Sequence, residues 1–188
     1  MRKIQSKHRH KREERIKQII IGGILILIMF TSVLGYAFQS IGDKSDENKI
    51  DYNGFKFEFQ NNYWILENTF AFKYNPKETE DFYVDNLNLI ENYQDEPLYI
   101  YSEYNEAENE IYRNLYNFAQ RIQNACLNDS SLNCNPDWPV KSCDDNFILI
   151  SEGNFNVTQN NNCLFIIGPR ENLTKISDEV LYNIIGVK

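Results

Sequence analysis

Histidine is almost missing from this sequence of 188 residues: it occurs twice, as His8 and His10. The rest of the chain therefore cannot form a Ser-His-Asp or Cys-His nucleophile system, or a histidine-ligated metal site. A glycine-rich phosphate loop and the Asp-x-Asp-x-Asp-Gly pattern of calcium loops are missing as well. These absences leave no catalytic residue, cofactor or metal site to predict.

Acidic residues are abundant by contrast, with 27 Asp and Glu in the chain. Two carboxylates are enough for glycosidase-type hydrolysis, but among so many acids neighbouring pairs arise by chance and specify no site. Trp64 and Trp138 could stack on sugars, although packing in a core or loop is the commoner role of tryptophan. A carboxylate-dependent hydrolase is therefore kept as an alternative without assigned residues.

The charge is divided unevenly along the chain, which has a formal net charge of −8. Residues 1–17 contain eight Lys and Arg against Glu13 and Glu14, so the remainder is strongly acidic. An acidic domain repels nucleic acid, whose binding depends on Lys and Arg neutralising phosphates. The basic tail is better explained as a topology signal attracted to anionic lipid. The bilayer is thus an expected partner and nucleic acid is not.

A charge-free apolar run covers residues 19–38. Twenty helical residues span about 30 Å, the thickness of the hydrocarbon layer, which predicts a transmembrane helix. The preceding basic cluster places the N-terminus in the cytoplasm and the C-terminal domain outside the cell membrane. We therefore expect a single-pass protein with a tail (1–18), a span (19–38), a linker (39–51) and an acidic ectodomain (52–188).

Two other interpretations of the apolar run remain open. A cleaved secretory signal is favoured by the small residues Gly35 and Ala37, but the run is longer than the apolar part of such signals. A pilin-like leader is favoured by the basic start and by Gly22-Gly23, but the acidic residue usual in that class is missing at its expected offset. The uncleaved anchor explains the length of the run best.

The ectodomain alternates between strand-like and helix-like patterns. Phe55, Phe57 and Phe59 recur with the period of two that is typical of a half-buried strand. The expected strands cover 55–60, 63–66, 70–74, 98–102, 147–151, 155–158 and 164–167. One helix is expected from about residue 106, with its apolar face at Ile111, Leu115, Phe118, Ile122 and Cys126, and another over 171–185. We predict an α+β fold, with a mostly antiparallel sheet and two packed helices.

Four cysteines, Cys126, Cys134, Cys143 and Cys163, all lie beyond the apolar run. An even number in an extracytoplasmic domain favours disulfides, for which three connectivities exist. We favour Cys126–Cys134, which joins the predicted helix to its loop, and Cys143–Cys163, which joins strands starting at the same edge. Zinc is disfavoured because the cysteines are widely spaced and no histidine follows residue 10.

Three N-x-[ST] sequons begin at Asn128, Asn156 and Asn172. In a domain outside the membrane each of them could be glycosylated. An asparagine-rich sequence also produces such triplets by chance, so the pattern alone does not decide the matter.

The C-terminal quarter, from Asn162-Cys163 through Gly168-Pro169 to Leu181-Tyr182 and Ile185-Gly186, resembles the ending of uncharacterised single-pass archaeal membrane proteins. The resemblance implies a cell-surface domain and supplies no catalytic residues. Taken together, the sequence favours a non-enzymatic envelope protein that binds a partner protein or a surface polymer. The alternatives are a membrane-tethered carboxylate-dependent hydrolase and a pilin-like secretion component.

Overall fold

The computed structural model describes residues 17–32, 48–128 and 134–188. The chain divides into two compact units, Met1–Glu47 and Asn48–Lys188. In the first unit, residues 17–32 form an α-helix. Within the described residues, no helix is both long enough and apolar enough to cross a membrane. The predicted span 19–38 continues past residue 32, and its last residues, like the basic tail before residue 17, lie outside the described ranges, so the membrane anchor stays a prediction.

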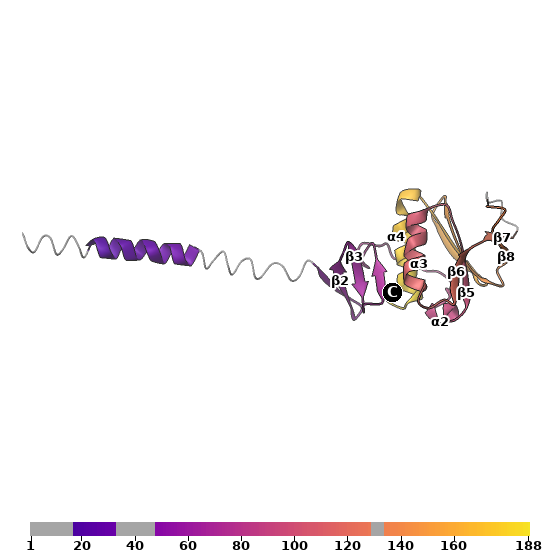
Figure 1. The fold of residues 1–188 in the computed structure, drawn as a ribbon, viewed down its shortest axis with the longest axis horizontal. Helices are drawn as coiled ribbons and strands as arrows, with labels where there is room; N and C mark the ends of the chain where they lie inside the picture. The colour runs from indigo at the N-terminus through magenta and orange to yellow at the C-terminus, as the bar shows by residue number, and fades with distance from the viewer. Residues whose placement is uncertain (1–16, 33–47, 129–133) are drawn as a thin grey trace, which may run out of the picture. The chain divides into compact units, whose positions relative to one another are not determined.

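The second unit begins with a four-stranded antiparallel sheet (Figure 1). Its strands in order are β1 (Lys49–Tyr52), β2 (Phe55–Gln60), β3 (Tyr63–Leu66) and β4 (Phe70–Phe72). Turns of two residues, Asn53-Gly54 and Asn61-Asn62, join the first three strands, and a three-residue turn, Glu67–Thr69, joins β3 to β4. Both residues of each shorter turn, and Glu67 and Asn68 of the longer one, have positive φ. Asparagine tolerates this left-handed conformation better than other non-glycine residues. The antiparallel meander is confirmed, but it starts at Lys49, inside the stretch expected to be linker.

A second sheet of five strands has the order β10-β11-β9-β5-β6. Its members are β5 (Pro97–Ser102), β6 (Arg121–Asn124), β9 (Asn146–Glu152), β10 (Asn156–Asn160) and β11 (Cys163–Gly168). Three of its pairings are parallel, and only β10 with β11 is antiparallel. The α+β class is therefore confirmed, while the expectation of a mostly antiparallel sheet was wrong for this half of the domain. The nearly continuous apolar runs of β5 and β9 are typical of parallel strands buried on both faces.

The helices are α2 (Ile90–Tyr93), α3 (Asn105–Leu115) and α4 (Leu173–Ile184), the last preceded by the short 3-10 helix η1 (Arg170–Asn172). The first predicted long helix was expected to reach Cys126 but ends at Leu115. Ile122 lies in β6, which pairs in parallel with β5. The chain after α3 therefore returns along β5 as a β-α-β crossover, and this non-local pairing prevails over the helical spacing of Phe118, Ile122 and Cys126.

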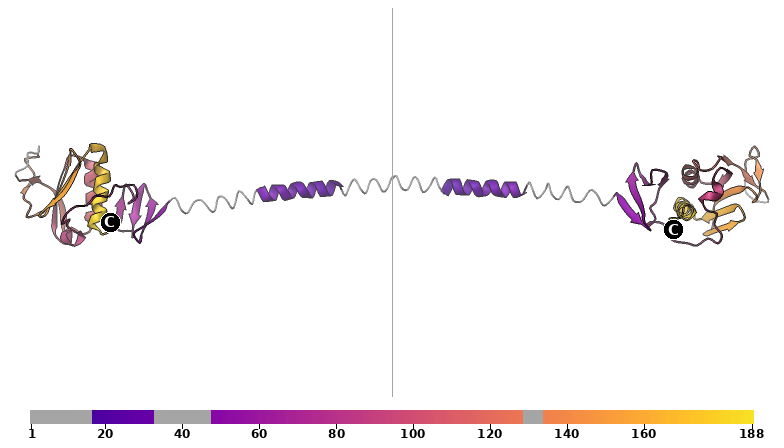
Figure 2. Two further views of the ribbon diagram at one scale, coloured as in Figure 1. Left: turned by 180° about the vertical axis from the view of Figure 1, so that it is seen from behind. Right: turned by 90° about the horizontal axis from the view of Figure 1, so that it is seen from below.

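Helices α3 and α4 lie between the two sheets (Figures 1 and 2). One large core includes Phe57 and Phe72 of the first sheet, Ile111 and Val180 of the helices, and Ile150 of the second sheet. Because α4 has a sheet on either side, it is buried nearly all round, including Thr174, Ser177, Asp178 and Glu179.

The opposite face of the second sheet is covered by a loop that contains the paired strands β7 (Cys126–Leu127) and β8 (Val140–Lys141). A smaller core forms there around Tyr99, Tyr101, Phe147 and Leu149, with Trp138 packed against it. The disulfides are Cys126–Cys134 and Cys143–Cys163, so the favoured pairing is confirmed. The second bridge forms because β9 and β11 are parallel neighbours whose starts meet at one edge, rather than the first and third strands of a meander.

Candidate functional site

Two acidic side chains, Glu110 of α3 and Asp178 of α4, are buried side by side where the two helices meet. Glu110 is 3% exposed and Asp178 is 0% exposed. Arg113 and Asn114 lie on the same face of α3 as Glu110, because residues three and four positions apart are neighbours on a helix. This polar face of α3 points toward strand β4, where the guanidinium of Arg113 and the amide of Asn114 both donate to the Ala71 carbonyl.

The side chains around the pair form a connected hydrogen-bond network. The Tyr74 amide donates to Asp178 Oδ2 at 2.8 Å, and the Tyr182 hydroxyl donates to the Tyr74 carbonyl at 2.5 Å. Arg113 donates to Glu110 at 2.9 Å, and its guanidinium lies over the Tyr63 ring, 4.1 Å from the centroid. The network therefore joins both helices to the end of the first sheet.

Both carboxyls of this pair have pKa values above their usual range. Asp178 Oδ1 makes no hydrogen bond within the described residues. Two carboxyl groups placed close together disfavour ionising at the same time. Burial raises the pKa of Asp178 well above its usual range, and the neighbouring Glu110 charge raises it further. Burial also raises the pKa of Glu110, against the opposing effect of Arg113. Burial therefore disfavours ionisation of both groups, and of Asp178 more strongly.

This carboxyl pair has the raised pKa values that hydrolytic chemistry needs but lacks access to a substrate. None of the three hollows found along residues 48–128 and 134–188 is lined by Glu110 or Asp178. A general acid must reach the atom that it protonates, directly or through one water. The geometry is that of an internal clasp, a buried polar contact that joins α3, α4 and β4, and these two acids are not accessible to a substrate.

A third buried acid, Glu179, is neutralised by a lysine. Glu179 is 1% exposed, and its carboxylate lies 2.6 Å from Lys188 Nζ, which also lies 2.6 Å from Asp81. Burial alone would lower the pKa of Lys188, but the hydrogen bonds to Asp81 and Glu179 outweigh it and raise that pKa. Lys188 thus keeps its charge and ties the C-terminal residue to α4.

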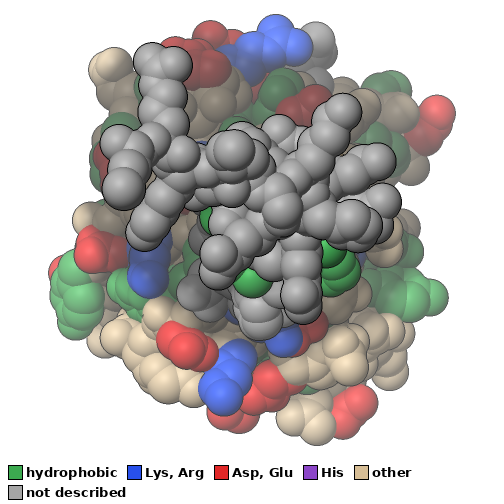
Figure 3. Space-filling view, turned by 90° about the vertical axis from the view of Figure 1, so that its left-hand side faces the viewer, with side chains coloured by type: hydrophobic (Ala, Val, Ile, Leu, Met, Phe, Trp, Pro, Cys, Tyr) green, Lys and Arg blue, Asp and Glu red, His purple; other side chains and the backbone are tan. Residues whose placement is uncertain are grey.

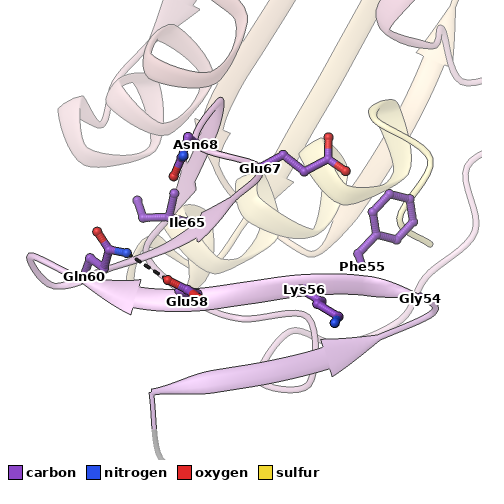
Figure 4. Close-up of a pocket in the computed structure, with 8 residues that line it drawn as sticks. All are labelled: Gly54, Phe55, Lys56, Glu58, Gln60, Ile65, Glu67 and Asn68. Atoms are coloured by element: carbon purple, nitrogen blue, oxygen red, sulfur yellow. Dashed lines mark hydrogen bonds between the residues drawn. The ribbon is translucent and has the colours of Figure 1, made fainter. Parts of the chain in front are cut away.

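The first hollow, here the sheet-face hollow, lies on the first sheet and has a volume of about 440 Å³ (Figure 4). Its lining comes from β2, β3 and the turns beside them: Gly54, Phe55, Lys56, Glu58, Gln60, Ile65, Glu67 and Asn68. Glu58 is held by Lys49 at 2.7 Å and by the Gln60 amide at 3.1 Å. The charges of this hollow are therefore partly neutralised within the sheet.

The second hollow, here the amide hollow, is the most polar, with a volume of about 670 Å³. It is lined by Asn86, Asn88, Cys143, Asp144, Gln159, Asn160, Asn161 and Asn162. The Asn162 amide side chain donates to the Asp144 carbonyl at 3.1 Å, and the Cys143–Cys163 disulfide fixes the two segments that meet there. Side-chain amides both donate and accept hydrogen bonds, so this lining matches neutral polar ligands.

The third hollow, here the aromatic hollow, is the smallest at about 140 Å³. Its lining consists of Glu80, Phe82, Phe155, Pro169, Asn172, Lys175, Ile176 and Glu179. Phe82 and Phe155 meet edge to face with ring centroids 5.3 Å apart, and Phe155 is 55% exposed. Gly168 lies directly against the Ile176 side chain, which would have to move to make room for a Cβ at this position.

Asn128, Asn156 and Asn172 are all exposed, although the sequon of Asn128 continues into residues outside the described ranges. Trp64 lies in the large core and Trp138 packs on the smaller one, so packing explains both tryptophans. Within the described residues, no cluster of three or more His, Cys, Asp or Glu could hold a metal ion. Acidic and basic side chains are interspersed on the visible part of the surface in Figure 3.

The sequence did not predict the carboxyl pair. Asp178 is one of several polar residues in α4, so nothing in the local pattern marks it, and its partner Glu110 lies 68 positions earlier in the chain. Asparagine has a structural role in the first sheet, where Asn53, Asn61, Asn62 and Asn68 take left-handed conformations in the turns. In comparisons with protein-family models, curated proteins and solved structures, the chain matches none of them.

Proposed function

We propose that this chain is a single-pass cell-membrane protein whose disulfide-bonded domain lies outside the membrane and binds a component of the envelope without catalysing a reaction. The basic tail and the apolar run support the topology. Two disulfides within one domain support an oxidising compartment. The resemblance of the C-terminal quarter to archaeal membrane proteins agrees with this placement and stays a prediction.

The observation that carries the binding role is that the buried Glu110–Asp178 pair lies apart from the hollows, which are open to solvent. The carboxyl pair with raised pKa values is sealed between α3 and α4, whereas the largest of the three hollows is lined mainly by amides. Amides bind without transferring protons at neutral pH, and neutral polymers such as polysaccharides offer hydroxyls that match both their donors and their acceptors. A neutral surface polymer at the amide hollow is therefore the favoured ligand.

The topology is tested on intact cells that produce the full chain. A membrane-impermeant thiol reagent should label the four cysteines only after reduction, and protease added outside should remove the domain 48–188. Cysteines that react without reduction, or a domain protected from external protease, would refute the outer placement. An N-terminus that begins inside the apolar run would instead support the pilin-like alternative.

The binding role is tested by co-sedimentation of the full chain with insoluble envelope polysaccharide. We expect saturable binding that weakens several-fold in Asn160→Ala, which removes an exposed amide of the amide hollow. Gln123→Ala, an exposed amide on β6 outside every described hollow, is the matched control and should bind normally. Release of new reducing ends from the polymer would instead establish a hydrolase, and equal losses in the two variants would disprove binding at this hollow.

A further inference from the structure

We propose that Asn172 carries an N-linked glycan whose first sugar packs into the aromatic hollow, against Phe82 and Phe155. This inference rests on the proposed outer placement of the domain, because sequons are glycosylated only after translocation. Beyond the placement, it specifies which of the three sequons is modified and which surface the sugar covers.

Asn172 differs from the other sequon asparagines because it lines a hollow itself. It occupies the position before α4, and its side-chain oxygen accepts no capping hydrogen bond from the helix, so the amide group is not held against the helix end by a cap. The residue is exposed and belongs to the lining of the aromatic hollow. A sugar attached to this nitrogen therefore begins at the rim of the hollow, and the covalent link removes most of the entropy cost of placing it there.

The walls of the hollow match the two kinds of surface on a sugar ring. Phe155 exposes 55% of its surface and meets Phe82 edge to face, which offers an apolar wall to the C–H face of a pyranose. Glu80 and Lys175 provide an acceptor and a donor for hydroxyl groups. Covering the aromatic pair removes apolar area from water and so stabilises the domain.

Asn156 offers a contrast within the same chain. Its sequon lies in β10, where Asn156 and Thr158 are exposed while Val157 points inward. Asn156 lines none of the three hollows. A glycan at Asn156 would therefore extend into solvent, and its removal should leave the stability of the domain unchanged.

The transfer has to precede folding of α4. Thr174, the third residue of the sequon, is 8% exposed and lies in the first turn of that helix. In the transfer, the Asn172 nitrogen forms a bond to the anomeric carbon of a sugar carried on a lipid phosphate, and the bond from that carbon to the phosphate oxygen breaks. The nitrogen loses one proton and the lipid phosphate leaves as the anion, in a reaction catalysed by a membrane oligosaccharyltransferase during translocation.

The test uses the full chain produced in cells that glycosylate translocated sequons, with site occupancy read by glycopeptide mass spectrometry. We expect Asn172 to be occupied and Asn172→Gln to lower the Tm by about 3 °C. Asn156→Gln should change the Tm by less than about 1 °C. In a Phe155→Ala background the effect of Asn172→Gln should disappear, and in a host without glycosylation the parent and Asn172→Gln should unfold at the same temperature.

Several results would overturn the inference, and they separate it from the proposed function. An unmodified Asn172 in a chain whose cysteines are oxidised, with or without a glycan at Asn156, refutes this inference alone. The same holds if Asn172 is occupied but its removal leaves the Tm unchanged, or lowers it equally without Phe155. Unmodified sequons together with cysteines that react before reduction refute both the glycan and the outer placement.

Discussion

The two faces of the five-stranded sheet are built in different ways. The face toward α3 and α4 carries aliphatic side chains such as Leu98, Ile148 and Ile150 and belongs to the large core. The opposite face carries Tyr99, Tyr101 and Phe147 and is covered by a loop with two disulfides. A helix buries a continuous apolar stripe with its own backbone hydrogen bonds satisfied, whereas a loop does neither. On the loop-covered face the covalent bridges supply the order that regular secondary structure supplies on the other.

Side-chain chemistry follows the same division. On the loop-covered face, Arg121 donates to the Tyr99 hydroxyl at 2.8 Å and Lys141 lies 4.1 Å from the centre of the Tyr99 ring. Hydrogen bonds from Lys141 and Arg121 lower the pKa of Tyr99. Tyrosine suits this face because its ring is buried while its hydroxyl meets polar groups at the border. Charged groups thus contribute at the rim of the small core, whereas the large core encloses the Glu110–Asp178 clasp completely.

The largest expected effect is a difference in the free energy of unfolding between two substitutions on opposite faces of the same strand. Ile150 and Leu149 are neighbours in β9 but belong to different cores. Ile150→Ala should lower the free energy of unfolding by about 4 kcal/mol, because the helices and two sheets around it cannot collapse into the cavity. Leu149→Ala should cost only about 2 kcal/mol, because the covering loop can move inward. Urea unfolding of the purified full chain measures both, and equal costs would contradict the contrast.

The next effect concerns the disulfides. Replacing Cys143 and Cys163 by serine opens a bridge with a sequence separation of 20 and should cost about 3 kcal/mol. The pair Cys126 and Cys134, with a separation of 8, is the matched control and should cost about 2.5 kcal/mol. One tryptophan, Trp64, lies in the large core and the other, Trp138, packs on the small one, so variants that keep a single tryptophan follow the two faces separately by fluorescence. Trp138 should lose its native signal at lower urea than Trp64; a single shared transition would show that the bridges stabilise the whole domain equally.

The smallest effect tests the clasp through its pH dependence. The folded state raises the pKa of Asp178, so the folded chain binds more protons than the unfolded chain above the usual value of 3.8. The contribution of this group to stability therefore falls as pH rises from that value through the folded-state pKa. Asp178→Asn keeps an acceptor for the Tyr74 amide and cannot ionise. It should remove this slope and stabilise the domain by about 1 kcal/mol at neutral pH relative to the parent; parallel pH profiles of parent and variant would refute the raised pKa of Asp178.

Local patterns predicted much of this fold. The alternation of Phe55, Phe57 and Phe59 predicted strand β2 of the first sheet, and the structure contains the two disulfides that the sequence favoured. The order of the second sheet was not predictable in this way, because the pairing of β9 between β5 and β11 depends on contacts far apart in sequence. The end of α3 was misjudged for the same reason, since Ile122 has a helical spacing but a strand partner in Leu98. Glu110 and Asp178 meet only once α3 and α4 are packed, so no local motif marks them.

Asn114 has a consequence for how copies of this domain can associate through the first sheet. Its side-chain amide donates to the Ala71 carbonyl at 2.9 Å and accepts from the Ala71 amide at 2.8 Å, as a neighbouring strand would. Asp178 accepts from the Tyr74 amide just beyond. The β4 edge is therefore closed by the chain's own side chains, and the strand order leaves β1 as the other edge of this sheet. Each copy then has one edge available for pairing, at β1. Two copies that paired through their β1 strands would leave no further edge of this sheet available, so edge pairing through it ends at a dimer and cannot propagate into a fibre.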